Sequence, residues 1–279
     1  MEPIISAKWL RAEIGKSDLR VIDATCFLPG AEQDARSAYE EAHIPGAVFF
    51  DLDEVVDNAS PFPHMLPPEP KFASRTQALG LGDGSRIVIY DNSPLHSAAR
   101  AWWMFGVFGI PKVSVLNGGL AAWKAVGGNL QSGNPDLRRR HFTLQPDYAR
   151  VRNLDDMREI VRTGSAQIVD ARSPARFAGV DPEPRPGLRS GHMPGAINLP
   201  NAELFTADGC YKDEAGLRAA FAAAGVDLAR PIVATCGSGI TAANIVLTAT
   251  LLGATDVSLY DGSWAEWGAQ PDTPVVTGS

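Results

Sequence analysis

The second half of this chain repeats the first half. Three pairs of matched segments carry the repeat: VIDA and IVDA at residues 21–24 and 168–171, AHIPGA and GHMPGA at 42–47 and 191–196, and IVIY and IVAT at 87–90 and 232–235. Each half then places a glycine shortly before a tryptophan, Gly118 before Trp123 and Gly262 before Trp267. Two copies of one domain explain this order economically.

The repeated unit is predicted to be an α/β domain. Short β-branched runs alternate with helix-like stretches such as residues 97–108 and 214–224, which indicates a mainly parallel sheet with helices on both faces. A length of 279 residues suits two domains, each large enough to bury its own core. We expect a first domain over residues 1–130, a linker rich in Gly, Asn, Pro and Arg over 131–150, and a second domain over 151–279.

Charge and composition exclude several classes of partner. A net charge of −7 argues against nucleic acid or an anionic membrane surface, and the basic run at residues 138–140 is interpreted as a solvated face of the linker. The start of the chain does not resemble an export signal, and the apolar run over 101–110 is too short to cross a bilayer, so we expect a cytoplasmic protein. Three widely spaced cysteines predict neither a disulfide framework nor a metal site, and no cofactor is expected.

Cys236 is the candidate nucleophile. It opens the run Cys236-Gly237-Ser238-Gly239-Ile240-Thr241, between a strand-like stretch (232–235) and a helix-like one (242–252). The glycines allow a tight turn whose N–H groups converge as a nest, and the following helix adds the positive end of its dipole, so both favour a thiolate. A cysteine after a buried strand is more often a small core residue, but such a residue needs no glycines around it.

The repeat supplies an internal comparison for this cysteine. When the strands 87–90 and 232–235 are aligned, Asp91 takes the place of Cys236. The loop that begins at Asp91 stays polar but carries no sulfur nucleophile. We therefore expect the first domain to be inactive in the chemistry of the second.

These residues resemble the tandem-domain rhodanese superfamily, and the loop at Cys236 resembles its mercaptopyruvate sulfurtransferase branch. The resemblance extends over almost the whole chain, from Trp9 to the closing YDGSW at 260–264. It implies two rhodanese domains, the second of them catalytic. It also implies that the nest of Gly237, Gly239, Ile240 and Thr241 binds the transferred sulfur.

The same resemblance implies which sulfur donor is used. Family members that use thiosulfate carry basic residues where this chain has Gly237 and Ser238. A mercapto acid instead needs its carboxylate held at a distance from the sulfur, for which arginine has the matching fork. By resemblance, Arg176 and Arg185 take this role, although two surface arginines are the more usual explanation of such a pair. Arg172 and Arg189 are nearby competitors.

A proton relay is implied as well. The Ser-His-Asp group proposed for the family corresponds to Ser238, His64 and Asp53, in which the Asp orients the His and the His takes a proton through the Ser. His43 and His192, which precede Ile-Pro-Gly and Met-Pro-Gly in the repeated segments, are interpreted as structural.

The expected reaction moves the sulfur of 3-mercaptopyruvate through a Cys236 persulfide to a thiol acceptor, such as a thioredoxin-like protein, or to cyanide, and releases pyruvate. The alternatives are a thiosulfate sulfurtransferase and a persulfide carrier without turnover. A phosphatase is disfavoured because the sixth residue after Cys236 is Ala242, where that class has an arginine that clamps the oxyanion.

Overall fold

The chain forms two compact units in the computed structural model, which describes residues 1–278. The first unit contains Met1–Asn58, Leu66–Asp147 and the short segment Ala207–Cys210. The second contains Ala59–Met65, Tyr148–Thr206 and the chain from Tyr211 onward. The domain limits at residues 130 and 151 remain a prediction, and Ser279, the last residue of the second range, lies outside the described residues.

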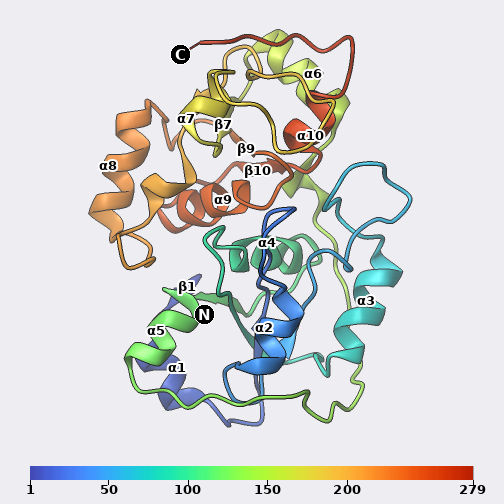
Figure 1. Cartoon of the computed structure of the whole chain (residues 1–279), viewed down its shortest axis with the longest axis vertical. Helices are drawn as coiled ribbons and strands as arrows, with labels where there is room; N and C mark the ends of the chain where they lie inside the picture. Colours follow the sequence, from blue (N-terminus) through green and yellow to red (C-terminus); the bar gives the residue numbers. More distant parts are fainter. Residues whose placement is uncertain (279) are drawn as a thin grey trace. The chain divides into compact units, whose positions relative to one another are not determined.

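The first unit, whose helices α1 to α5 are labelled in Figure 1, is built on a five-stranded sheet of order β1-β5-β4-β2-β3 in which every pair is parallel. Its elements in chain order are β1 (Ile4–Ile5), α1 (Ala7–Glu13), β2 (Leu19–Asp23), α2 (Ala35–Glu41), β3 (Val48–Phe49), α3 (Glu69–Ala78), β4 (Arg86–Tyr90), α4 (Ala98–Val107), β5 (Val113–Leu116) and α5 (Gly119–Ala125). The buried β-branched residues of β2, β4 and β5 explain why these runs form the middle of the sheet.

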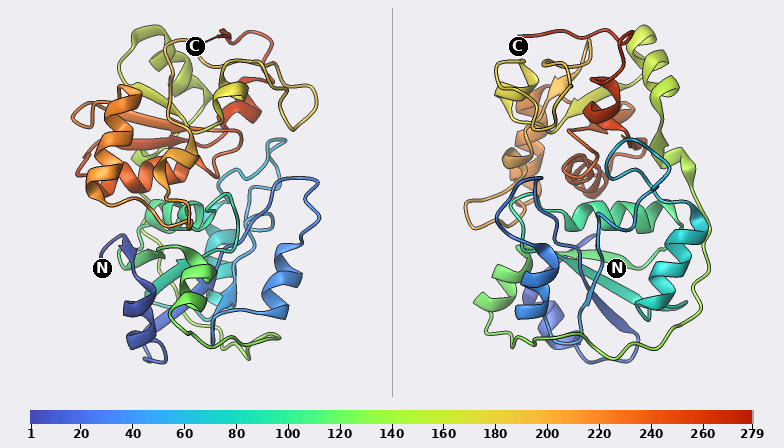
Figure 2. Two further views of the ribbon diagram at one scale, coloured as in Figure 1. Left: turned by 60° about the vertical axis from the view of Figure 1, so that its left-hand side comes forward. Right: turned by 45° about the vertical axis from the view of Figure 1, so that its right-hand side comes forward.

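Helices cover both faces of this sheet. On one face, Leu10 of α1, Tyr39 of α2 and Trp123 of α5 pack against alternate strand residues such as Val21 and Val88. A separate aromatic cluster joins Phe72 of α3 to Phe105 of α4 and to Phe108, the residue that follows α4, with Phe72 and Phe108 stacked at 4.1 Å between ring centroids. The right-hand view of Figure 2 shows α3 and α4 beside the sheet.

The second unit repeats this architecture with the sheet order β6-β10-β9-β7-β8, again with parallel pairs throughout. Its elements are η1 (Tyr148–Arg150), β6 (Val151–Arg152), α6 (Leu154–Thr163), β7 (Gln167–Asp170), α7 (Pro174–Phe177), β8 (Ile197–Asn198), η2 (Asn201–Leu204), α8 (Glu214–Ala224), β9 (Ile232–Thr235), α9 (Ala242–Leu251), β10 (Val257–Tyr260) and α10 (Ser263–Trp267).

Local sequence signals fix the helix ends of this unit. Asn153 and Asp156 form a capping box at the start of α6, in which each side chain accepts a hydrogen bond from the other residue's N–H. The side chain of Asp213 accepts from the N–H of Gly216 to start α8, and Gly225, at φ 80°, ends it in the left-handed conformation. The central strand β9 is buried along its whole length and carries the chain into the loop at Cys236.

Candidate functional site

The loop at Cys236 follows β9, the middle strand of its sheet, and leads into α9. Ligands of such sheets bind at the carboxyl ends of the strands. The start of α10 holds the loop: Cys236 N donates to Ser263 Oγ at 3.3 Å, while Cys236 O accepts from Trp264 N and Gly237 O from Ala265 N, both at 2.9 Å. These bonds fix the backbone at Cys236, and the residue is only 2% exposed.

The N–H groups of residues 237–241 remain available as donors. Within residues 1–278 they form no hydrogen bond to a nitrogen or oxygen. Gly239, at φ 79°, provides the left-handed turn that lets the chain curl here before α9 begins at Ala242. Because buried N–H groups are almost always paired, this loop is suited to hold an anionic ligand above Cys236.

Ser238 and His64 form a hydrogen-bonded pair. His64 Nδ1 lies 2.9 Å from Ser238 Oγ, although the two residues are 174 positions apart. The segment Ala59–Met65 belongs to the second unit, and His64 adopts a left-handed φ of 60°, an uncommon conformation for a residue with a side chain. The structure thus brings together two of the three residues predicted for the relay.

The guanidinium of Arg176 lies directly over the loop. Arg176 is the third residue of the short helix α7, and its Nη2 is 3.0 Å from the position that a Cβ on Gly237 would occupy. Glycine at this position therefore leaves room for the guanidinium. The Arg176 side chain is 21% exposed, so a substrate can reach it.

Glu183 fixes Arg176 from behind. Its carboxylate is 2% exposed and accepts hydrogen bonds from Arg176 through Nε and Nη2, and from Arg172 Nη1 at 2.8 Å. Arg172 is 1% exposed, bonds to Asp170 and to Gly191 O, and lies 4.3 Å over the ring of Trp264. A buried chain of alternating charges, Asp170, Arg172, Glu183 and Arg176, therefore connects the sheet to the loop.

The contacts of the four candidate arginines differ. Arg172 is enclosed in the network, and Arg189 donates to the carbonyls of Trp267, Gly268 and Thr273, so both have structural partners. Arg176 reaches the loop, while Arg185 is half-buried in the irregular segment after Glu183. Sequence reasoning missed Glu183, although a carboxylate between arginines in a proline-rich segment was the available signal.

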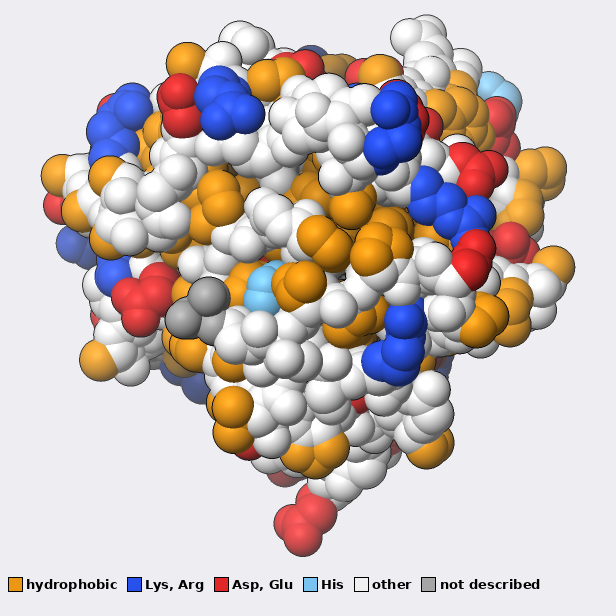
Figure 3. Space-filling view, turned by 90° about the horizontal axis from the view of Figure 1, so that it is seen from above, with side chains coloured by type: hydrophobic (Ala, Val, Ile, Leu, Met, Phe, Trp, Pro, Cys, Tyr) orange, Lys and Arg blue, Asp and Glu red, His pale blue; other side chains and the backbone are white. Residues whose placement is uncertain are grey.

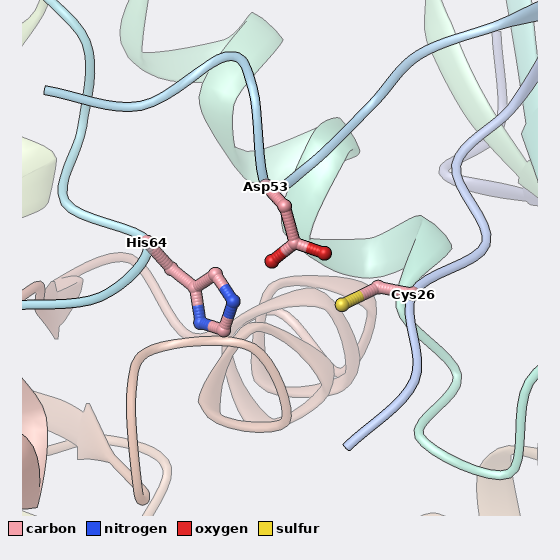
Figure 4. A group of neighbouring side chains, drawn as sticks. All are labelled: Cys26, Asp53 and His64. Atoms are coloured by element: carbon pink, nitrogen blue, oxygen red, sulfur yellow. The ribbon is translucent and has the colours of Figure 1, made fainter. Parts of the chain in front are cut away.

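Asp53 lies in the first unit. It is exposed, its N–H donates to Asp51 Oδ1 at 3.1 Å, and a carboxylate oxygen lies within 4.8 Å of Cys26 Sγ (Figure 4). Figure 4 also labels His64, which belongs to the second unit. The role of Asp53 in the relay stays a prediction.

A Rhodanese-like domain matches the sequence twice, at residues 6–126 and 153–270. The chain belongs to the rhodanese-like family. This confirms the predicted fold class of two tandem α/β domains.

Two relatives and one solved structure are similar to this rhodanese-like protein along almost their whole length. It is 42% identical to 3-mercaptopyruvate sulfurtransferase of Homo sapiens over 283 residues, which cover 99% of this chain and 95% of the relative. It is 41% identical to thiosulfate sulfurtransferase of Cricetulus griseus over 284 residues, with 99% and 95% covered. The crystal structure of SseA from Escherichia coli, described as a 3-mercaptopyruvate sulfotransferase, superposes with a TM-score of 0.87 at 39% identity, covering 95% of this chain and 99% of that one.

The first rhodanese-like unit has an equivalent loop in which Asp91 replaces the cysteine. Asp91 follows β4 as Cys236 follows β9, and Asp91 O accepts from Leu120 N at 3.0 Å, the counterpart of the bond from Trp264 N to Cys236 O. The Asp91 carboxylate accepts from the N–H of Ala98 at 2.8 Å and of Ser93 at 3.3 Å. A side chain of the loop itself thus accepts hydrogen bonds from these N–H groups, and the inactivity of this copy stays a prediction.

The repeated histidines of the two units have matching structural partners. His43 Nδ1 lies 2.7 Å from Tyr39 O and its ring stacks on Tyr39, while His192 Nδ1 lies 2.8 Å from Phe177 O and stacks on Phe177 at 3.7 Å. Both are buried. Their packing agrees with the structural role predicted for them.

No helix formed by residues 1–278 has the length and apolar character needed to span a membrane. On the face drawn in Figure 3, basic and acidic side chains are interspersed rather than gathered into one large area of a single sign.

Proposed function

We propose that this protein is a 3-mercaptopyruvate sulfurtransferase that works through a persulfide on Cys236. The observation that carries the proposal is the position of the Arg176 guanidinium over Gly237, next to the cysteine and its loop of available N–H groups. The positive charge of Arg176 lies beside Gly237 and not at Cys236 itself. This position suits a donor in which the carboxylate is separated from the sulfur that Cys236 attacks. Arg185 is the second clamp on that carboxylate.

In the proposed reaction, the Cys236 thiolate attacks the sulfur of 3-mercaptopyruvate. A sulfur–sulfur bond forms, the carbon–sulfur bond breaks, and its electron pair leaves as the enolate of pyruvate, which a proton converts to pyruvate. The outer sulfur of the Cys236 persulfide is then held by the N–H groups of Gly237, Ser238, Gly239, Ile240 and Thr241. A thiolate acceptor attacks this sulfur and leaves Cys236 as a thiolate again.

His64 and Ser238 are proposed to move the protons. The substrate arrives with a thiol proton that must leave, and the enolate needs one in return. The 2.9 Å contact between His64 Nδ1 and Ser238 Oγ supports a path through both side chains. Asp53 is proposed to orient His64. The acceptor is proposed to be a small thiol, a thioredoxin-like protein or cyanide, and the compartment to be the cytoplasm.

Replacing the nucleophile tests the central assignment. Cys236→Ser should reduce pyruvate release from 3-mercaptopyruvate by at least about a thousandfold, because serine is not ionised at neutral pH and is a poor sulfur acceptor. Cys210→Ser is the matched control, since this cysteine lies in the first unit, and it should retain activity. Pyruvate production by Cys236→Ser at close to the wild-type rate would contradict the proposal.

Thiosulfate is the second donor to consider, because one relative is named thiosulfate sulfurtransferase. Neither Gly237 nor Ser238 offers a charge to this small dianion. Arg185→Ala should therefore raise KM for 3-mercaptopyruvate by about tenfold or more and change any thiosulfate activity much less. Equal losses with the two donors would remove the role of Arg185 in selectivity. Mass spectrometry after one donor equivalent, followed by a thiol chase, separates an enzyme from a carrier that only loads sulfur.

A further inference from the structure

The first unit contains a basic cavity that the sulfur chemistry does not use. Its volume is about 840 Å³, within the usual range for small-molecule sites. The cavity is basic although the net charge of the chain is −7. Its lining contains one carboxylate, that of Asp136, and five cationic side chains, which are Lys16, Arg20, Arg138, Arg139 and Arg140.

The cations come from two separate parts of the unit. Lys16 and Arg20 flank the start of β2, which is the opposite end of the sheet from the loop at Asp91. Arg138, Arg139 and Arg140 come from the irregular segment after α5, which Figure 2 shows running along this end of the sheet. The run that the sequence suggested to be a solvated linker face therefore forms one wall of a cavity.

Hydrogen bonds hold this wall in place. Arg140 N donates to Gln77 O at 3.2 Å, and Arg139 Nη2 donates to Gln77 Oε1 at 3.0 Å. Just beyond, Asp83 N donates to His141 O at 3.0 Å, and Asp83 accepts from Thr143. The arginines are thus presented from a pinned backbone rather than from a free strand of linker.

Several of these charges have no acidic partner. Lys16 pairs with Glu13, but Arg20, Arg138 and Arg140 form no ion pair with any of residues 1–278. Arg20 is half-buried and donates to the carbonyls of Ser17 and Leu19. Burial and the charge of Arg140 lower the pKa of Arg20, while Asp18 opposes this. A bound anion would reduce the electrostatic repulsion between these neighbouring positive charges.

Part of the lining, here called the floor, is apolar. Ile14 and Leu79 are only partly buried and Leu137 is 39% exposed, so this part of the lining keeps apolar surface in contact with water. An inorganic ion would leave this surface uncovered, whereas an organic anion can cover it with an apolar body while its charges meet the arginines.

We propose that this cavity is a binding site for a small organic polyanion of the nucleoside polyphosphate type. The phosphates lie against Arg20, Arg138 and Arg140, and the base and sugar cover the apolar floor. The site is separate from Cys236 and does not depend on the proposed function, because every residue that lines it belongs to the first unit.

Calorimetric titration of the full chain with ATP and with inorganic tripolyphosphate, both without metal and at low ionic strength, tests the site. We expect one ATP per chain, bound at least about fivefold more tightly than tripolyphosphate, since only ATP covers the floor. Arg138→Gln and Arg140→Gln should each weaken ATP binding by about tenfold, as loss of a charged contact to phosphate does. Lys112→Gln, an exposed lysine of the same unit outside the cavity, is the control for net charge and should bind ATP as the wild type does.

Four results would overturn the proposal. Three of them are the absence of saturable ATP binding, equal weakening by Lys112→Gln and the cavity variants, and equal affinity for ATP and tripolyphosphate. Loss of ATP binding in Arg176→Gln with full binding in Arg140→Gln would also overturn it, because the anion would then lie at the loop of Cys236.

Discussion

Glu183 is predicted to set the affinity for the sulfur donor although it is buried behind Arg176. In Glu183→Gln the shape of the side chain is kept, but the charge that holds Arg176 and Arg172 is lost. Arg172 keeps its bonds to Asp170, so the protein should still fold. Arg176, in contrast, has no other carboxylate partner among the described residues.

The size of the effect follows from these contacts. Hydrogen bonds to charged groups contribute about 1.5–3 kcal/mol each, and the amide of Gln replaces part of this, so we expect a loss of about 2 kcal/mol in the free energy of unfolding. For a protein of this size that lowers Tm by roughly 5 °C. Freeing the arginine side chain restores up to about 2 kcal/mol of rotamer entropy, which must be lost again when the donor binds. KM for 3-mercaptopyruvate should therefore rise by about tenfold, with kcat changed less than about threefold.

Steady-state pyruvate release together with thermal unfolding measures both effects. The matched control is Glu159→Gln, which removes an exposed carboxylate paired with Arg162 on the surface of α6. Such pairs contribute little, so Tm and KM should stay close to those of the wild type. A folded Glu183→Gln protein with an unchanged KM would show that Arg176 needs no such support, and would refute the reasoning.

Three further predictions concern the two equivalent loops. Gly237→Ala should raise KM for 3-mercaptopyruvate several-fold with little loss of stability. The reason is that the new Cβ would lie 3.0 Å from Arg176 Nη2 and displace the guanidinium, which is the flexible end of that side chain. An unchanged KM would argue against binding of the donor carboxylate by Arg176. Gly239→Ala should instead lower both kcat and Tm, since φ 79° strains alanine by about 1 kcal/mol or more, and equal effects of the two variants would contradict this distinction. Burial raises the pKa of the Asp91 carboxyl from 3.8 to about 7. Between pH 3.8 and about pH 7 this carboxyl is therefore protonated in the folded state and ionised in the unfolded state. The free energy of unfolding should fall as pH rises through this range, by about 4 kcal/mol at most. Asp91→Asn should flatten this dependence in urea unfolding measured from pH 4 to pH 8, and a slope equal to that of the wild type would exclude the assignment.

The long central elements could be predicted from the sequence because hydrophobic periodicity and capping residues specify them locally. The strand 232–235 and the helix 214–224 were predicted with the bounds that the structure has, and the helix expected over 97–108 is α4, Ala98–Val107. The edge strands β1 and β6, of two residues each, were not predicted. Runs this short have no period to detect, and their pairing depends on the neighbouring strand.

The site was predictable to a smaller extent. Cys236 could be singled out because its glycine-rich loop is a local pattern, and Arg176 because it resembles a family motif. Glu183 was missed, because a carboxylate between arginines in the sequence does not reveal that it is buried between Arg172 and Arg176, and burial follows from tertiary packing. The contact between His64 and Ser238 was expected only by resemblance, since nothing in the local sequence encodes a pairing over 174 positions.

That contact also limits how the repeat can be divided. The segment Ala59–Met65 is encoded within the first copy, yet it belongs to the unit that contains Cys236. A gene fragment that begins at residue 151 would therefore encode the cysteine, its loop and Arg176, but would lack His64. Each copy contributes a short segment to the unit of the other, Ala59–Met65 in one direction and Ala207–Cys210 in the other, so the unit that contains Cys236 is not a contiguous stretch of the chain and cannot be cut out as one.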